Sequence, residues 1–311
     1  MRVFHRSSEL PLLVFTTLAQ FTLGVFTSIF VAAYSGFEAL GWSVRFLWVA
    51  MACALLASIF HASRNRLSAY RVTLNLASSR LSREVLSAGL FLLLLAGYAY
   101  FSWFKGEGFP LHPVYDGVTL LAGFAMLAFM ASAYLLPARP FWNTPYTLTL
   151  FTSSVFILGP LGAWTLYALH QFSYSQTPVL SIVSLTYCRW AALVTIIMLL
   201  IRIFHASLHV RNLKRRGVIP ERFKVSLGRL PPVRTLTAAV ALILAGLIFL
   251  YVGWPIRTVE GLILLVSVEF LVLLFGEVVE KAIFYRLMAS PIGVVNLLSL
   301  AARLQALKQK V

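Results

Sequence analysis

Charged residues are scarce in this chain of 311 residues, and acidic ones are the scarcest. Only 12% of the residues are charged, with 10 Asp and Glu against 26 Lys and Arg. A water-soluble domain carries roughly a quarter charged residues, so the composition excludes an ordinary soluble globular protein. Hydrophobic residues make up 60% of the chain, and the mean hydropathy is +0.86. The composition therefore predicts an integral membrane protein.

Cysteine and histidine are also few. The two cysteines, Cys53 and Cys188, cannot supply the four thiolates that an iron–sulfur cluster normally needs. The six histidines lie at the ends of apolar segments or between them, whereas membrane haems take axial ligands from facing helices. The chain also shows no metal-ligand set, nucleotide-binding loop or nucleophile triad. We therefore expect no haem, no iron–sulfur cluster, no bound metal and no catalysis by this chain alone.

The hydrophobic residues are gathered into eight long blocks separated by Gly and Pro. About 20 apolar residues are enough for a helix to cross a bilayer. The first block is too long for the apolar region of a signal peptide, so we count it as a span. We predict an all-α integral membrane protein, a bundle of eight transmembrane helices forming a single domain over residues 1–311. The predicted spans are 10–34, 42–61, 84–104, 115–136, 146–169, 179–203, 234–254 and 258–287.

A short repeat suggests a subdivision of this bundle. The sequence Ile-Phe-His-Ala-Ser occurs at 59–63 and again at 203–207, at the ends of the second and sixth predicted spans. Repeats in corresponding positions are typical of membrane proteins built from two related halves. The bundle is therefore predicted to consist of two four-helix halves.

The basic residues lie almost entirely on one side of the predicted bundle. Arg45, Lys105, Arg189 and Arg257 fall on the opposite side, which leaves 22 of the 26 Lys and Arg on the side that holds both termini. Loops rich in Lys and Arg normally stay in the cytoplasm, so both termini are predicted to be cytoplasmic. The net charge of +16 thus reflects membrane topology, and we expect no nucleic-acid partner.

Two basic clusters, in the second and sixth loops, dominate the charged side. Contact with anionic lipid headgroups is one interpretation of these clusters. Docking of an acidic soluble subunit is the other, and the sequence leaves both open. The candidate contact residues are Arg64, Arg66, Arg71, Arg80, Arg215 and Arg216.

Two ionisable residues fall near the middle of predicted spans. Arg189 and Glu269 both lie about 15 Å from the weakly charged side, as the helical rise implies. Charged groups at this depth usually have a partner, so we predict that the two side chains form an ion pair. The pair could be purely structural, or it could be the substrate or proton site of a secondary transporter.

Further polar residues gather at the basic end of the helices. Each has a local explanation: Glu277 can pair with Lys281 one helical turn away, and Glu84 at a helix start is favourable to the helix dipole. Together they suggest a site that handles protons. The residues in question are Glu9, His61, Glu84, Glu277 and Glu280.

Several segments in order along the chain resemble one family. They are Glu9–Leu12, Ser58–His61, Leu81–Glu84, Tyr134–Pro140 and Gly276–Glu277. This ordered set is similar to the membrane-anchor subunits of dimethyl-sulfoxide reductase. The residues after His61 differ, because the family usually has a Leu-Gly-x-Pro turn where this sequence reads Ala-Ser-Arg-Asn.

The resemblance implies an anchor subunit of an anaerobic respiratory molybdenum oxidoreductase in a bacterial or archaeal cytoplasmic membrane. Such an anchor oxidises menaquinol and passes the electrons to an iron–sulfur subunit, which serves a molybdopterin catalytic subunit. The quinol-binding residues of the family correspond here to His61 and Glu84, and we add Glu9, Arg83 and Tyr70 as candidates. Histidine and a partly buried carboxylate are suitable acceptors for the quinol protons. A secondary transporter and a purely structural anchor remain the alternatives.

Overall fold

The computed structural model describes residues 9–36, 43–62, 79–105, 110–135, 142–174, 182–215, 230–252 and 259–289. Within these ranges the regular structure is entirely helical. The helices are α1 (Glu9–Tyr34), α2 (Val44–Ala62), α4 (Arg80–Tyr100), α5 (Pro113–Tyr134), α6 (Pro145–Tyr174), α7 (Ile182–Arg215), α9 (Leu230–Tyr251) and α10 (Val259–Ala289). A short π-helix, η4 (Phe101–Lys105), continues α4.

Seven of these helices are long and apolar enough to cross a membrane. The shorter apolar helix, Val44–Phe60, lies within α2. The predicted all-helical membrane architecture is therefore confirmed, with seven helices long enough to span a membrane, and that α2 is the eighth span stays a prediction. That residues 1–311 form a single domain stays a prediction.

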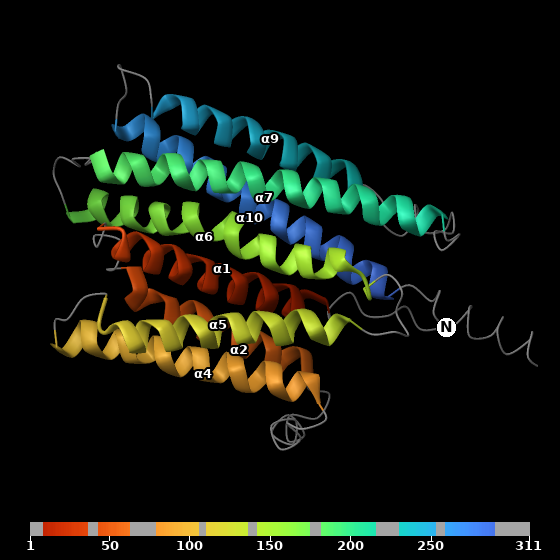
Figure 1. Ribbon diagram of the computed structural model, residues 1–311, viewed down its shortest axis with the longest axis horizontal. Coiled ribbons are helices and arrows are strands. Elements are labelled where there is room, and N and C mark those ends of the chain that lie inside the picture. The colour runs from red at the N-terminus through yellow and green to blue at the C-terminus, as the bar shows by residue number, and fades with distance from the viewer. Residues whose placement is uncertain are drawn as a thin grey trace, which may run out of the picture.

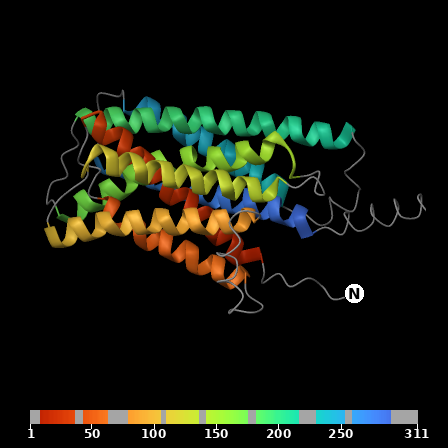
Figure 2. The ribbon, with the colours of Figure 1, turned by 60° about the horizontal axis from the view of Figure 1, so that its bottom comes forward.

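The helices contact one another in two groups of four. In the first group α1 packs on α2, α2 on α4, α4 on α5 and α5 on α1; in the second the same cyclic order holds for α6, α7, α9 and α10. The groups are joined by an extensive contact of α1 with α6 and by smaller contacts of α1 with α10 and of α5 with α6 (Figure 1). In the view turned by 60° the helices still run along one common direction (Figure 2). That the two groups are repeats of each other stays a prediction.

The contact between α1 and α6 depends on two glycines that face each other. A Cβ atom added to Gly159 would lie 2.4 Å from the backbone carbonyl of Gly24, and one added to Gly24 would lie 2.2 Å from the Val155 carbonyl oxygen. Small residues allow helix backbones to approach closely, which is the main source of packing energy between membrane helices. The junction between the two groups is therefore a backbone-to-backbone contact.

Helix ends at the basic side are fixed by side chains. The Ser79 hydroxyl accepts a hydrogen bond from the Ser82 amide at 3.2 Å and caps α4. Next to it, the Arg80 guanidinium donates to the carbonyls of Ser132 and Leu135, both at 2.8 Å, and satisfies the end of α5. These contacts join the start of α4 to the end of α5 and hold Glu84 at a defined depth.

Helix α7 is longer than its predicted span, which ended at residue 203. It continues to Arg215, because no Gly or Pro interrupts residues 204–215, and Ala, Leu, Lys and Arg among them favour the helix. The extra turns carry His205 and His209 on the basic end of the bundle.

Candidate functional site

Consecutive helices run antiparallel, and each helix has one end at the basic side of the bundle. The beginnings of α1, α4, α6 and α9 and the ends of α2, α5, α7 and α10 meet there (Figure 1). Most of the buried charged residues of the described part of the chain lie in the halves of the helices nearer this side. The candidate functional groups therefore lie at this end.

Glu84, in the first turns of α4, is buried, with only 3% of its surface exposed. Its carboxyl group lies close enough to Tyr134 of α5 and Tyr285 of α10 to interact with both electrostatically. The two tyrosine hydroxyls are 3.3 Å apart, and Tyr285 donates a hydrogen bond to the Thr16 hydroxyl at 3.1 Å. A buried acid thus lies beside a series of hydroxyl groups that crosses from α5 through α10 to α1.

Aromatic rings surround this series of hydroxyls. The ring of Tyr134 has its centroid 5.2 Å from Trp142, 5.3 Å from Phe151 and 5.4 Å from Phe284. Trp142 stacks on Phe284, and its indole nitrogen donates to the Phe284 carbonyl. Such an apolar enclosure strengthens the interactions of the polar groups within it.

The other predicted quinol-site residues are placed to different extents. His61 lies in the last turn of α2 and Glu9 at the start of α1, both at the same end of the bundle as Glu84, and their side chains are outside the description. Arg83 is exposed at the start of α4. Tyr70 lies outside the described residues.

Only some of the arginines predicted to contact lipid or a partner subunit are among the described residues. Arg80 and Arg215 are exposed at the basic end. The remaining candidates are outside the described residues. These are Arg64, Arg66, Arg71 and Arg216.

A second buried cluster joins α6, α7 and α10. The Arg202 guanidinium forms a salt bridge with Glu277 and donates to the Ser153 and Ser154 hydroxyls at 2.7 and 3.1 Å. Glu277 also accepts a hydrogen bond from Ser154 at 2.6 Å and lies 3.4 Å from the Lys281 amine. The Glu277–Lys281 pair predicted from their spacing is confirmed, and Arg202 is a partner that the sequence analysis did not identify.

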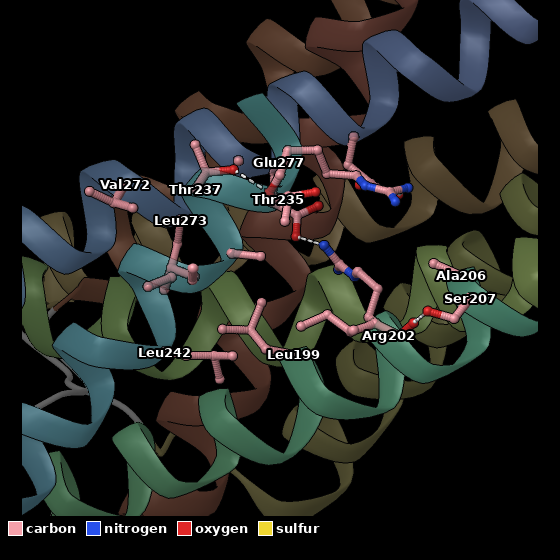
Figure 3. A pocket seen from close by; sticks show the side chains of 17 residues that line it. Leu199, Arg202, Ala206, Ser207, Thr235, Thr237, Leu242, Val272, Leu273 and Glu277 are labelled. Atoms are coloured by element: carbon pink, nitrogen blue, oxygen red, sulfur yellow. Dashed lines mark hydrogen bonds and ion pairs between the residues drawn. The ribbon is translucent and has the colours of Figure 1, made fainter. Parts of the chain in front are cut away.

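The cluster borders a groove of about 330 Å³ between α7, α9 and α10. Figure 3 shows Arg202 reaching from α7 toward Glu277 on α10, with leucines at the inner end of the groove. At the outer end Arg234 lies 3.6 Å from Glu280, which also accepts a hydrogen bond from Tyr146. The groove therefore has a charged mouth and an apolar inner end.

The predicted ion pair of Arg189 with Glu269 is wrong. Arg189 is exposed, and its guanidinium carbon lies 4.5 Å above the ring of Phe249 on α9. Glu269 is fully buried, and neither of its carboxyl oxygens has a hydrogen-bond partner among the described residues. Arg189 and Glu269 lie at a similar depth. Cys188, the residue before Arg189, faces the interior of the bundle, and adjacent residues of a helix point in different directions, so Arg189 points outward.

A third polar group lies at the weakly charged end. Asp116, in the first turn of α5, is fully buried and accepts hydrogen bonds from Tyr98 at 2.5 Å and Tyr34 at 2.9 Å. It joins the ends of α1 and α4 to the start of α5. Across the described residues, no group of three or more His, Cys, Asp or Glu is placed to hold a metal ion.

Comparison with known proteins identifies the family. Residues 5–287 match the family described as the DMSO reductase anchor subunit (DmsC). The anaerobic dimethyl sulfoxide reductase chain YnfH of Escherichia coli (strain K12) is 22% identical over 289 residues, which are 90% of this chain and 94% of that protein. The C subunit of the anaerobic dimethyl sulfoxide reductase of the same organism is 24% identical with the same coverage. The protein described here belongs to the DMSO reductase anchor subunit family.

Proposed function

We propose that this protein is the membrane anchor of a molybdenum oxidoreductase, where it binds and oxidises menaquinol. Electrons then pass to an iron–sulfur subunit and onward to a molybdopterin catalytic subunit. The observation that carries the proposal is the buried carboxyl group of Glu84 beside the hydroxyls of Tyr134 and Tyr285, at the bundle end where α2 brings His61. Family membership over residues 5–287 supports it.

Menaquinol must lose two protons and two electrons to become menaquinone. Each quinol hydroxyl therefore needs an acceptor within hydrogen-bond reach. In the proposed site His61 takes one proton and Glu84 the other, while the two electrons leave for the iron–sulfur subunit. Glu9 and Tyr70 are further candidates for contacts with the quinol, and so is Arg83, which is exposed and precedes the buried Glu84 in the sequence.

We place both termini and the basic end in the cytoplasm of a bacterial or archaeal cell. The exposed arginines at this end, with Arg80 and Arg215 among those described, would meet anionic headgroups or an acidic face of the iron–sulfur subunit. Docking at the basic end would place the acceptor of the electrons next to the quinol site.

Replacing Glu84 by glutamine should lower menaquinol-dependent turnover of the assembled complex about a hundredfold. Glutamine keeps the size of the side chain but cannot take a proton, and a positioned base typically contributes this factor or more. His61→Ala should have a similar effect. Turnover is measured in membranes with a reduced menaquinol analogue, and separately with a soluble dye that donates electrons directly to the partner subunits.

The dye-driven activity should stay unchanged in both variants, because it bypasses the anchor. Glu260→Gln is the matched control: this carboxylate is exposed at the opposite end, and we expect its quinol-dependent turnover to equal that of the unmodified protein. Normal quinol turnover in both site variants would refute the assignment. Loss of both activities together would instead show that assembly had failed.

A further inference from the structure

Glu269 has no role in the proposed quinol site, and its surroundings are unusual. It lies near the middle of α10, is fully buried, and receives no hydrogen bond on either carboxyl oxygen from any described residue. An ionised carboxylate at this depth, without donors, would cost several kcal/mol. The neutral, protonated carboxyl is therefore the form that fits this place.

Two more buried polar atoms lack hydrogen-bond partners among the described residues in the same part of the molecule. They are the hydroxyl of Thr195 on α7 and the indole nitrogen of Trp164 on α6. Nearly all buried polar groups in proteins have a partner, which can be an ordered water. If the unsatisfied groups of Glu269, Thr195 and Trp164 lie at the same depth in the bundle, they therefore indicate a common polar site.

The Arg202 cluster sets the relative heights of these helices, because it joins Arg202, Glu277 and Ser154. At a rise of 1.5 Å per residue, Thr195 lies about 10 Å and Glu269 about 12 Å deeper than the cluster. Trp164, ten residues after Ser154 on a helix that runs the other way, lies about 15 Å deeper. The three unsatisfied groups thus share one layer of the bundle.

Thr195 and Glu269 also lie on the inward faces of their helices. Cys188, Thr195 and Arg202 are seven residues apart on α7 and are all buried, so they form one inward stripe. Glu269 and Glu277 lie on the buried stripe of α10. Cys188 packs in one buried cluster with Trp164 of α6 and with Val266 and Leu273 of α10, which places the inward stripes of α7 and α10 toward each other at this depth.

The groove at the basic end leads toward this layer. Its lining includes Arg234 near the start of α9 and Glu280 and Glu277 toward the end of α10, and it extends to Leu199 and Leu273 deeper in the bundle. Leu273 lies one helical turn from Glu269, and Leu199 one turn from Thr195, in both cases toward the basic side. The groove therefore ends about 6 Å short of the unsatisfied layer.

Other ionisable groups near Glu269 do not supply a countercharge. Cys188 faces it from α7, and the neighbouring Tyr187 donates its hydroxyl to the Pro160 carbonyl. Arg189 points outward over Phe249. The nearest cations on the described inward faces belong to the Arg202 cluster, about two turns away.

We propose that Glu269 is a proton-binding site in the middle of the membrane, and that the groove between α7, α9 and α10 leads from the basic face to within about 6 Å of it. The carboxyl group gives its proton to a water molecule that crosses the remaining gap from the groove, and takes one back, and nothing is oxidised or reduced. This site is separate from the proposed quinol site, and its test requires no quinol.

The first test is modification with dicyclohexylcarbodiimide, an apolar reagent that attacks protonated carboxyl groups in membranes. The carboxyl proton moves to one carbodiimide nitrogen, the oxygen bonds to the central carbon, and an acyl shift gives a stable N-acylurea. In the intact complex we expect the adduct on Glu269, located by mass spectrometry. Glu269→Gln should abolish this adduct, and Glu260→Gln should leave it in place. An unmodified Glu269 would overturn the proposal.

The second test addresses the route. In membranes transferred to D₂O, the infrared carbonyl band that is absent from Glu269→Gln reports exchange of the carboxyl proton. Ala238→Trp fills the groove and should slow this exchange at least tenfold. Leu236→Trp, on the exposed face of the same helix, should not change it. Equal exchange rates in the two tryptophan variants would overturn the groove as the path.

Discussion

Replacing Glu277 by leucine should destabilise the anchor by about 3–5 kcal/mol, which is enough to prevent its accumulation in the membrane. The substitution leaves the buried cations of Arg202 and Lys281 without their shared carboxylate. Removing one partner of a buried ion pair has this effect because the remaining charge stays desolvated and unpaired. The measurement is the thermal unfolding midpoint of the detergent-solubilised complex, together with the amount of anchor in the membrane.

The matched variants separate charge from size. Glu260→Leu removes an exposed carboxylate from the same helix and should change the stability by less than about 0.5 kcal/mol. Replacing Arg202, Glu277 and Lys281 together by leucine should restore much of the stability, because apolar residues of similar volume often substitute well for a buried ionic cluster. In that variant the Ser153 and Ser154 hydroxyls can both donate to the Leu150 carbonyl, so neither hydroxyl proton is left without an acceptor. A stable single variant, or a triple variant no better than the single one, would contradict this account of the cluster.

Replacing Gly159 by leucine should separate the two groups of four helices. Even the first carbon of a side chain would meet backbone atoms of Gly24 at 2.4 Å, and a backbone cannot move aside in the way that flexible side chains do. Overpacking of a close contact costs about 1–3 kcal/mol, and the α1–α6 crossing places this position at the upper end of that range. The expected result is a complex that loses its partner subunits or unfolds at a markedly lower temperature.

Gly246→Leu is the control for this prediction. A Cβ atom at Gly246 on α9 meets nothing within 4 Å, so the substitution should be neutral or slightly stabilising through helix propensity. Equal thermal midpoints for the two variants would show that the α1–α6 contact is not as close as the structure places it.

The helices themselves were predictable from the sequence because each span is a long apolar block with few charges. Local pairs were predictable for a similar reason: Glu277 and Lys281 lie one turn apart on the same helix, so their spacing alone indicates the contact. These features depend on residues that are neighbours along the chain.

Partners on different helices were harder to predict. In a span that is apolar on all sides, the sequence does not reveal which face turns inward, so depth alone suggested a pair between Arg189 and Glu269. The inward face of α7 carries Cys188 and Arg202 instead, and Arg202 finds its partners on α6 and α10. The one sequence signal that could have indicated Arg202 is that this charged residue lies inside the predicted span 179–203, where a charged side chain usually has a partner.

The candidate quinol site was predicted from residue types and family resemblance, and the structure adds its neighbours. Glu84 was identified as an acid at the start of a helix. Tyr134 and Tyr285 were not identified, because they are 151 residues apart in the sequence and their hydroxyls meet only when α5 and α10 pack together.

The most direct test of the account is to locate bound quinone. A photoreactive naphthoquinone is added to the intact complex in membranes, and the cross-linked peptides are identified by mass spectrometry. The account predicts labels in the last turn of α2 around His61 and in the first turns of α4 around Glu84, with competition by excess menaquinone. Labelling confined to the groove between α7, α9 and α10, or labelling that menaquinone does not displace, would contradict it.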